Sequence, residues 1–274
     1  MGIIRMKLIF DTDIGTDTDD AFALVYAIRS GIEIPLITTV HGDTKLRGRV
    51  AKKLTELLGV DIPIRAGEEK AIKQPFKYWY GDEGHGFLNG ENYDVKDNAV
   101  DAIAETIYSN RNNIAIASLA PLTNIAKAFQ RYPDLPNYVN RIYLMGNAIM
   151  RENEYFINYR AHNFKVDPEA VDIVIATAIP KTIVTTEIAR RNSITYDDID
   201  KIEKTGKVGK SLADAARFWM KKVNYTVSHM YDPLTVAHHL DMDLTERKDY
   251  KDETSITTGM KKPFIPGFLE KIIG

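Results

Sequence analysis

Short apolar runs alternate with amphipathic segments along most of the chain. The first run is Leu8, Ile9 and Phe10, and a polar loop separates it from a segment with helical spacing between Ala21 and Ile28. Further apolar runs predict strands at 34–40, 62–66, 114–119, 142–145 and 182–185, and helical spacing recurs at 45–58, 99–108, 122–129 and 168–176. The alternation predicts an α/β fold, a single domain over residues 1–274 with a mostly parallel sheet and helices on both faces.

Two stretches interrupt this alternation. Residues 76–94 form a long loop rich in glycine and aromatic residues, and loops of this length in a compact domain are usually functional. Residues 196–239 have helical spacing. We assign no element after Glu246, where charge is dense and periodicity is poor.

Several polar segments follow directly after predicted strands. They are the loop from Asp11 to Asp20 and residues 41–43, 119–124 and 145–147. Ligands of parallel α/β folds bind beyond the carboxyl ends of the strands. We therefore expect one cleft to collect these segments.

The loop after the first strand is strongly acidic. Within ten residues it contains Asp11, Asp13, Asp17, Asp19 and Asp20. Like charges this close repel unless they are compensated, and the N-terminus of the next helix compensates only Asp19 and Asp20. The remaining charge predicts a bound cation. Oxygen ligands without any cysteine favour calcium or magnesium over zinc.

Three other interpretations of the acidic loop are weaker. Any single aspartate here is well explained as a helix N-cap, but five together are not. An EF-hand loop requires a glutamate at its twelfth position, and counting from Asp11 that position is Phe22. A phosphate-binding loop requires a glycine-rich run followed by lysine, which this segment lacks.

Composition narrows the function classes. The 274 residues include 36 basic and 38 acidic side chains, a balance that argues against nucleic acid or a membrane surface as a partner. Cysteine is absent, so thiolate chemistry is excluded and a reducing compartment is compatible. No apolar run approaches the roughly 20 residues of a membrane span. We expect a cytoplasmic protein.

Five motifs in order resemble the inosine-uridine-preferring nucleoside hydrolase family. They are the acidic loop 11–21, Ala120-Pro-Leu-Thr-Asn-Ile-Ala126, Leu144-Met-Gly-Asn147, His162-Asn-Phe with Asp167-Pro-Glu-Ala170, and Tyr231-Asp-Pro-Leu234. The resemblance covers most of the chain to about residue 240. It implies a Rossmann-like fold, bound calcium, a ribonucleoside substrate whose N-glycosidic bond is hydrolysed to ribose and free base, and a homo-oligomer, tetramer or dimer.

The resemblance assigns roles by position. Asp13 resembles a calcium ligand that is also the general base for the attacking water. Asp20, Asp232 and the backbone carbonyl of Leu119 resemble the other calcium ligands. The positions implied to bind substrate are Asn163 and Met145 at the ribose, Asp17 or Asp19 at its hydroxyls, Asp43 where many members have asparagine, and His85 near the nucleobase. A calcium ion that holds the ribose diol and acidifies water suits this reaction.

Two departures from the family pattern concern the leaving base and the sugar. Tyr231 stands where many members have a histidine that acts as an acid, and a phenol with a reference pKa near 10 is a poorer acid at pH 7. Help for the leaving base could come instead from His85, His41, or stacking on Trp79 or Tyr80.

The second departure is Ala161, which replaces a glutamate. The contact to the 5′-hydroxyl is then lost, or is supplied by Asn158 or Glu154. Nucleobase preference stays open.

Two alternatives belong to other function classes. A haloacid dehalogenase-type phosphatase would use Asp11 as nucleophile, but Gly15-Thr16 come one residue too late for its motif. A non-catalytic nucleoside- or ribose-binding protein could retain the metal site and lack turnover. Structural interpretations are simpler for Asp167 as a helix N-cap, Asp11 as a support of the loop, His162 as a hydrogen-bonding residue and Trp219 as core.

Overall fold

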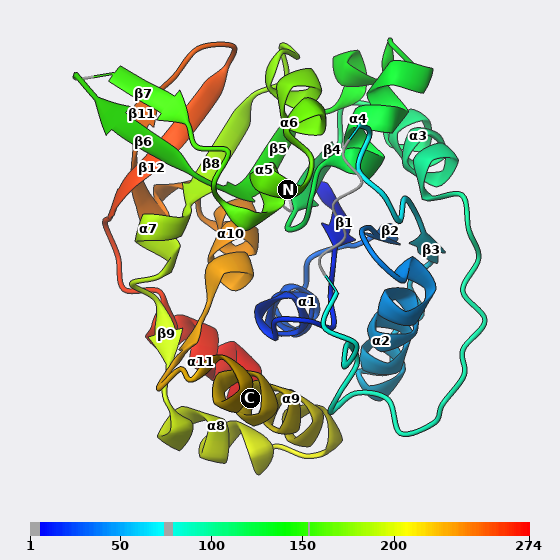
Figure 1. Ribbon diagram of the computed structural model, residues 1–274, viewed down its shortest axis with the longest axis vertical. Helices are drawn as coiled ribbons and strands as arrows, with labels where there is room; N and C mark the ends of the chain where they lie inside the picture. The colour runs from blue at the N-terminus through cyan, green and yellow to red at the C-terminus, as the bar shows by residue number, and fades with distance from the viewer. Residues whose placement is uncertain (1–5, 74–78, 153) are drawn as a thin grey trace, which may run out of the picture.

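The structure is a computed structural model that describes residues 6–73, 79–152 and 154–274. An eight-stranded sheet in the order β11-β12-β8-β5-β4-β1-β2-β3 runs through its centre (Figure 1). Every neighbouring pair is parallel except β11 and β12 at one edge. The strands are β1 (Lys7–Thr12), β2 (Leu36–Thr39), β3 (Ile64–Ala66), β4 (Ile114–Ser118), β5 (Arg141–Gly146), β8 (Lys181–Thr185), β11 (Thr245–Asp249) and β12 (Thr254–Met260).

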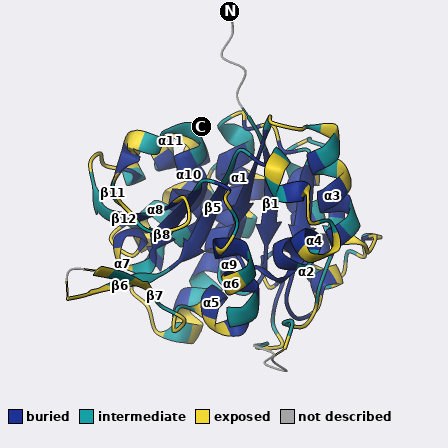
Figure 2. Cartoon of the chain, turned by 90° about the horizontal axis from the view of Figure 1, so that it is seen from above, coloured by how far each residue is buried: buried dark blue, intermediate teal, exposed yellow. Residues whose placement is uncertain are grey.

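Each face of the sheet carries its own hydrophobic layer. Successive side chains of a strand point to opposite faces, so Leu8 and Phe10 join one layer and Ile9 joins the other. The Leu8 layer includes α1 (Asp19–Arg29), α2 (Thr44–Leu57), α7 (Thr186–Ala189), α8 (Tyr196–Glu203), α9 (Lys207–Val223), α10 (Tyr231–Leu240) and α11 (Ile265–Ile273). The Ile9 layer includes α3 (Ala99–Ser109), α4 (Thr123–Arg131), α5 (His162–Val166) and α6 (Pro168–Ile175). Figure 2 shows the buried strands between these helices.

The predicted single α/β domain is confirmed. Each strand and helix predicted between residues 34 and 185 is present, with ends within two residues of the predicted bounds. The patterns were readable because these strands are buried on both faces and are therefore almost continuously apolar. Over the described ranges, no helix is both long and apolar enough to cross a bilayer.

The last third of the chain differs from the simple helical pattern. Residues 196–239 divide into α8, α9 and α10, and the pair β9 (Ser193–Ile194) and β10 (Ser228–His229) lies beside them. The sequence pattern predicts no helix or strand after Glu246. In the structure this segment supplies most of β11, all of β12 and α11. A hairpin of β6 (Ala148–Arg151) and β7 (Glu154–Ile157) was also not predicted. In the loop predicted at 76–94, residues 76–78 lie outside the described residues and 79–94 contain no helix or strand.

Candidate functional site

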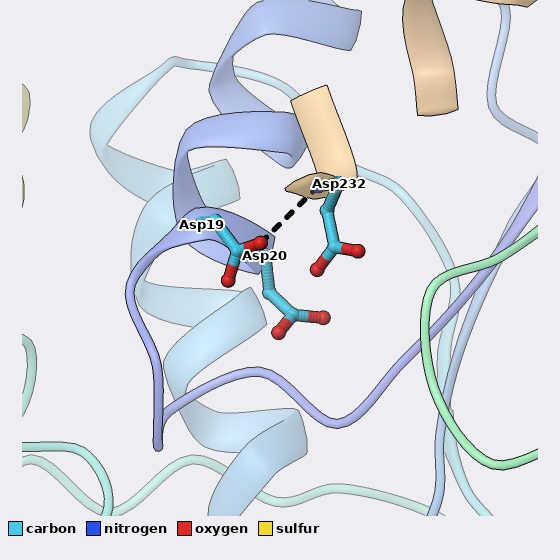
Figure 3. A group of neighbouring side chains, drawn as sticks. All are labelled: Asp19, Asp20 and Asp232. Atoms are coloured by element: carbon cyan, nitrogen blue, oxygen red, sulfur yellow. Dashed lines mark hydrogen bonds between the residues drawn. The ribbon is translucent and has the colours of Figure 1, made fainter. Parts of the chain in front are cut away.

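Three buried aspartates meet beyond the carboxyl end of β1. Asp19 and Asp20 begin α1, and Asp232 lies in the first turn of α10, which packs against α1. One carboxylate oxygen from each lies within 4.8 Å of the others (Figure 3). The backbone N–H of Asp232 donates to Asp19 Oδ2 at 3.2 Å, and the Thr12 hydroxyl donates to Asp20. Helix packing thus joins segments 213 residues apart in the sequence at one acidic cluster.

The chemistry of this cluster fits a hard cation. Burial, and then repulsion from neighbouring carboxylates, raises the pKa of Asp19, Asp20 and Asp232 well above the usual range. A divalent ion between the three carboxylates would offset both effects, because it pairs with the negative charge. The ligand atoms are oxygens, as calcium and magnesium prefer. The cluster is therefore suited to a metal ion.

A cavity of about 390 Å³ lies over the acidic cluster. It collects the loops that follow β1, β2 and β4 and the last residues of β5, as expected for ligand sites of parallel sheets. Nine of the predicted site residues line it: Asp13, Asp17, Asp19, Asp20, Leu119, Met145, Asn163, Tyr231 and Asp232. The expected cleft is present, and these residues share it.

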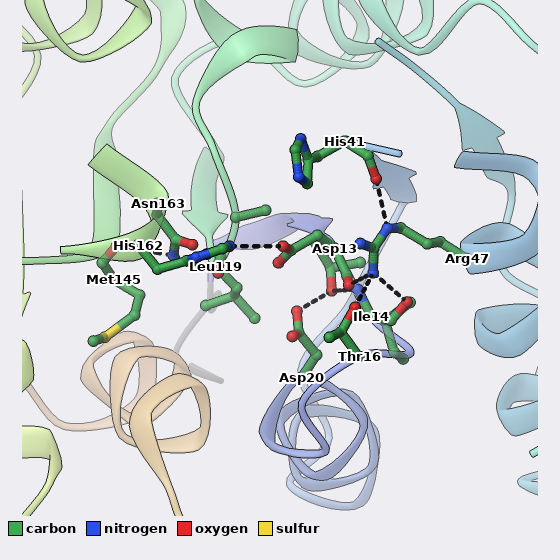
Figure 4. A network of polar contacts seen from close by, with 12 residues as sticks. Asp13, Ile14, Thr16, Asp20, His41, Arg47, Leu119, Met145, His162 and Asn163 are labelled. Carbon is green, nitrogen blue, oxygen red and sulfur yellow. Dashed lines mark hydrogen bonds and ion pairs between the residues drawn. The ribbon is translucent and has the colours of Figure 1, made fainter. Parts of the chain in front are cut away.

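Asp13 lies in the cavity wall with two histidines nearby. His162 Nε2 is 3.9 Å from Asp13 Oδ2, and the rings of His162 and His41 meet edge to face with centroids 6.4 Å apart (Figure 4). Burial lowers the pKa of His162, which favours the neutral imidazole. Asp13 therefore lies beside the neutral imidazole of His162.

Asn163 joins the ends of two strands. Its Nδ2 donates to the carbonyls of Leu119, at 2.8 Å, and Met145, at 3.2 Å. These bonds fix the orientation of the side-chain amide where β4 and β5 end. Leu119, Met145 and Asn163 therefore form one hydrogen-bonded part of the cavity wall.

Asp43 and His85 lie apart from this wall. Asp43 is exposed and caps α2, where it accepts a hydrogen bond from the Leu46 N–H at 2.9 Å. His85 is also exposed, and its ring stacks on Phe218 with centroids 3.8 Å apart. Neither residue lines the cavity as the described residues define it. The structure does not bring these two residues to the other nine.

Tyr231 reaches the cavity as a protonated phenol. Burial, and then the nearby Asp19 carboxylate, raises its pKa. Its ring lies 5.4 Å, between centroids, from that of His229. Tyr231 can therefore donate a hydrogen bond to a ligand, but it is a weaker acid than a free phenol.

Several cavity residues had no assigned role in the sequence. Arg47, Gly146, Arg160 and Thr186 line the wall, as does Trp219, which we expected in the core. Trp219 is half-buried, and its ring meets Tyr80, also in the wall, at 5.4 Å. The sequence pattern could not reveal them. A single basic or aromatic residue on an amphipathic segment looks the same whether it lines a cavity, faces solvent or packs in the core.

Asp11 and Asp167 have the structural roles expected of them. Asp11 is buried and accepts hydrogen bonds from Thr38, at 2.6 Å, and Asn124, at 2.8 Å. Asp167 caps α6 through the Ala170 N–H. Because Asp11 is held by residues of β2 and α4 and does not line the cavity, it is poorly placed to be a phosphatase nucleophile.

Comparison with known proteins finds ribonucleoside hydrolases among the relatives of this chain. The chain is 29% identical over 273 residues to the pyrimidine-specific ribonucleoside hydrolase RihA of Shewanella sp. (strain ANA-3), covering 92% of this chain and 85% of that protein. It is 26% identical over 241 residues to the non-specific ribonucleoside hydrolase RihC of Salmonella paratyphi B, covering 85% of this chain and 78% of that one.

The fold is also shared with solved structures. A purine-preferring ribonucleoside hydrolase from Gardnerella vaginalis superposes with a TM-score of 0.82 at 24% identity, covering 97% of this chain and 96% of that one. A plant nucleoside hydrolase, PpNRh1, gives a TM-score of 0.83 at 21% identity, covering 98% and 99%. The family model described as inosine-uridine preferring nucleoside hydrolase matches residues 8–262. This chain belongs to the inosine-uridine preferring nucleoside hydrolase family.

Proposed function

We propose that this protein is a calcium-dependent hydrolase of ribonucleosides, in which Asp13 activates the attacking water. The observation that supports this most directly is the shared cavity. Asp13, the Asp19-Asp20-Asp232 cluster and the amide of Asn163 all line one space of about 390 Å³. That space falls within the roughly 300–1,000 Å³ range of small-molecule sites.

The proposed calcium ligands are Asp13, Asp20, Asp232 and the carbonyl of Leu119. Asp19 lies in the same cluster, and its carboxylate already accepts the N–H of Asp232. When bound, calcium would supply positive charge that orients the sugar hydroxyls and makes a bound water more acidic. The four proposed ligands all line the cavity, which supports this assignment.

Asp13 is proposed as the general base. Its carboxylate would take a proton from water as the water attacks the anomeric carbon and the bond to the base breaks. His162, 3.9 Å from Asp13 Oδ2, would help to orient that carboxylate. The electron pair of the broken bond leaves with the base, which takes up a proton from solvent, while Asp13 returns its own proton to solvent, so that the net reaction consumes one water.

Sugar contacts are proposed for the polar wall. Asn163 would present its side-chain oxygen Oδ1 to the ribose, because its Nδ2 already donates to the Leu119 and Met145 carbonyls. Asp17 and Asp19 both line the cavity, so either carboxylate is placed to accept a hydrogen bond from a ribose hydroxyl. Such contacts orient the sugar and strengthen as it gains positive charge.

As the histidine that assists departure of the nucleobase, the geometry favours His41 over His85. His41 and Tyr231 line the cavity, whereas His85 and the proposed substrate residue Asp43 do not. Tyr80 and Trp219 offer aromatic faces on which a base could stack. The named relatives are pyrimidine-specific, non-specific or purine-preferring, so they do not transfer a base preference to this chain. Homo-oligomeric assembly and a cytoplasmic location stay predictions.

The test is a reducing-sugar assay with purine and pyrimidine ribonucleosides at saturating calcium. Ribonucleosides should release ribose, and deoxyribonucleosides should react more slowly because they lack the 2′-hydroxyl. Asp13→Asn should lower kcat by about 10²- to 10⁴-fold, the usual contribution of a general base. Asp61→Asn, an exposed change on the surface, is the matched control.

Two outcomes would contradict the proposal. Turnover by Asp13→Asn at the wild-type rate would reject the role of Asp13. Nucleoside binding without any ribose release by the wild type would favour a non-catalytic nucleoside-binding protein.

A further inference from the structure

Arg47 is an arginine inside an acidic site. It projects from α2, its side chain is 1% exposed, and it lines the same cavity as Asp13. Burying a guanidinium is costly unless its N–H groups are hydrogen-bonded. The hydrogen-bond partners of Arg47 therefore indicate the role of this side chain.

One edge of the guanidinium holds the acidic loop. Nη1 donates to the carbonyls of Asp13 and of Ile14, the latter at 3.1 Å, and approaches the hydroxyl of Thr16 at 3.2 Å (Figure 4). These are the residues that carry the chain from β1 to the metal cluster. Arg47 thus binds the backbone of the proposed base rather than its carboxylate.

The other edge holds the loop after β2. Nε donates to the carbonyl of His41 at 2.6 Å. His41 is a buried residue with a φ of 66°, a left-handed conformation that persists in a non-glycine residue only where the surroundings impose it. The bond from Arg47 is one such constraint.

Trp79 packs beside this guanidinium. Its ring centroid is 5.2 Å from Arg47 Cζ. The same ring packs over Gly42, where an added Cβ would lie 2.5 Å from a ring carbon. Arg47, Gly42 and Trp79 therefore fit together only if position 42 has no side chain.

We propose that Arg47 is a positioning residue that holds the backbones of Asp13 and His41 in fixed relation across the cavity. The inference rests on the proposed function. This role requires the planar guanidinium of arginine, because two different nitrogens of that one group bind two separate backbone segments. Lysine carries the same charge at a single nitrogen and cannot reproduce that geometry.

The test compares Arg47→Lys and Arg47→Ala with the wild type in steady-state ribose release. We expect kcat to fall at least tenfold in Arg47→Lys and further in Arg47→Ala, with KM within threefold. Guanidinium chloride at low millimolar concentration should restore part of the kcat of Arg47→Ala, whereas methylammonium should not. Arg49→Ala, on the same helix but outside the cavity wall, is the control for charge and helix propensity.

The outcomes separate this inference from the proposed function. A wild type that releases no ribose would reject the proposed function itself. An active wild type with an unchanged kcat in Arg47→Lys would overturn the inference, as would equal rescue of Arg47→Ala by methylammonium. Should Arg47→Ala fail to fold, the kcat and KM of Arg47→Lys decide the question alone.

Discussion

At the scale of single residues, the carboxylates suited to bind a metal ion also destabilise the folded protein when no ion is bound. Asp19, Asp20 and Asp232 are buried together, and their mutual repulsion opposes folding when no cation is bound. Sites that hold charge for a ligand commonly have this property. The same carboxylates should therefore stabilise the calcium-bound protein and destabilise the metal-free one.

Asp232→Asn should have opposite effects in the two states. Without metal it removes one of several repelling charges, so the free energy of unfolding at pH 8 should rise. With calcium the variant should gain less stability than the wild type, because a ligand is lost. Melting temperatures in EDTA and in calcium measure both effects.

Asp243→Asn is the control for that experiment, since Asp243 is exposed and pairs with Lys261 at 2.7 Å. If Asp232→Asn were destabilised in EDTA and stabilised by calcium as strongly as the wild type, Asp232 would not belong to the metal site.

At the scale of elements, the join between α10 and β11 depends on a buried histidine. The two ring nitrogens of His238 lie 2.8 Å from the carbonyl of Leu234 and 2.8 Å from the hydroxyl of Thr245, which begins β11. Burial lowers the pKa of His238 from 6.5 to about 4. The folded state therefore keeps this imidazole neutral through the mildly acidic range.

This join should weaken in acid. Between about pH 6.5 and 4 the unfolded chain binds a proton at His238 that the folded state does not, so this contribution is present above pH 6.5 and is lost as the pH falls. The loss should be about 2–3 kcal/mol between pH 7 and pH 4.5. Urea unfolding of wild type and His238→Gln at both pH values measures it, because the variant lacks this titration.

His85→Gln changes an exposed histidine and is the control. Identical pH dependence in the wild type and His238→Gln would show that His238 does not titrate on unfolding.

At the scale of the whole molecule, the proposed calcium site connects segments that lie far apart in the sequence. Its ligands come from the loop after β1, the end of β4 and the start of α10. A ligand that binds only the folded state stabilises the entire domain, since those segments, far apart in the sequence, meet only in the folded chain.

Removing calcium should therefore lower both activity and melting temperature. At a free calcium concentration of about 100 times Kd, the ion contributes about 2.7 kcal/mol, which for a chain of this size corresponds to about 5 °C in Tm. Calorimetry in EDTA and after adding calcium back measures the shift, with the Asp232→Asn variant as a reference for a weakened site. An unchanged Tm and unchanged ribose release after chelation would reject calcium as the cofactor.

The sequence by itself determined the alternation of strands and helices up to residue 185, and it marked the acidic loop as a candidate site. Strands buried on both faces are apolar along their length, so the sequence pattern reveals them. The acidic loop is recognisable because five aspartates stand close together in the sequence. By contrast, β12 is rich in threonine, and only its parallel pairing with β8 makes it part of the sheet.

Only the tertiary structure decided which polar residues share the cavity. It placed Arg47 and Trp219 in the wall and left Asp43 and His85 outside it. Whether a side chain enters a cavity depends on how its helix or loop packs against distant parts of the chain, and the local pattern of hydrophobic and polar residues does not contain that packing.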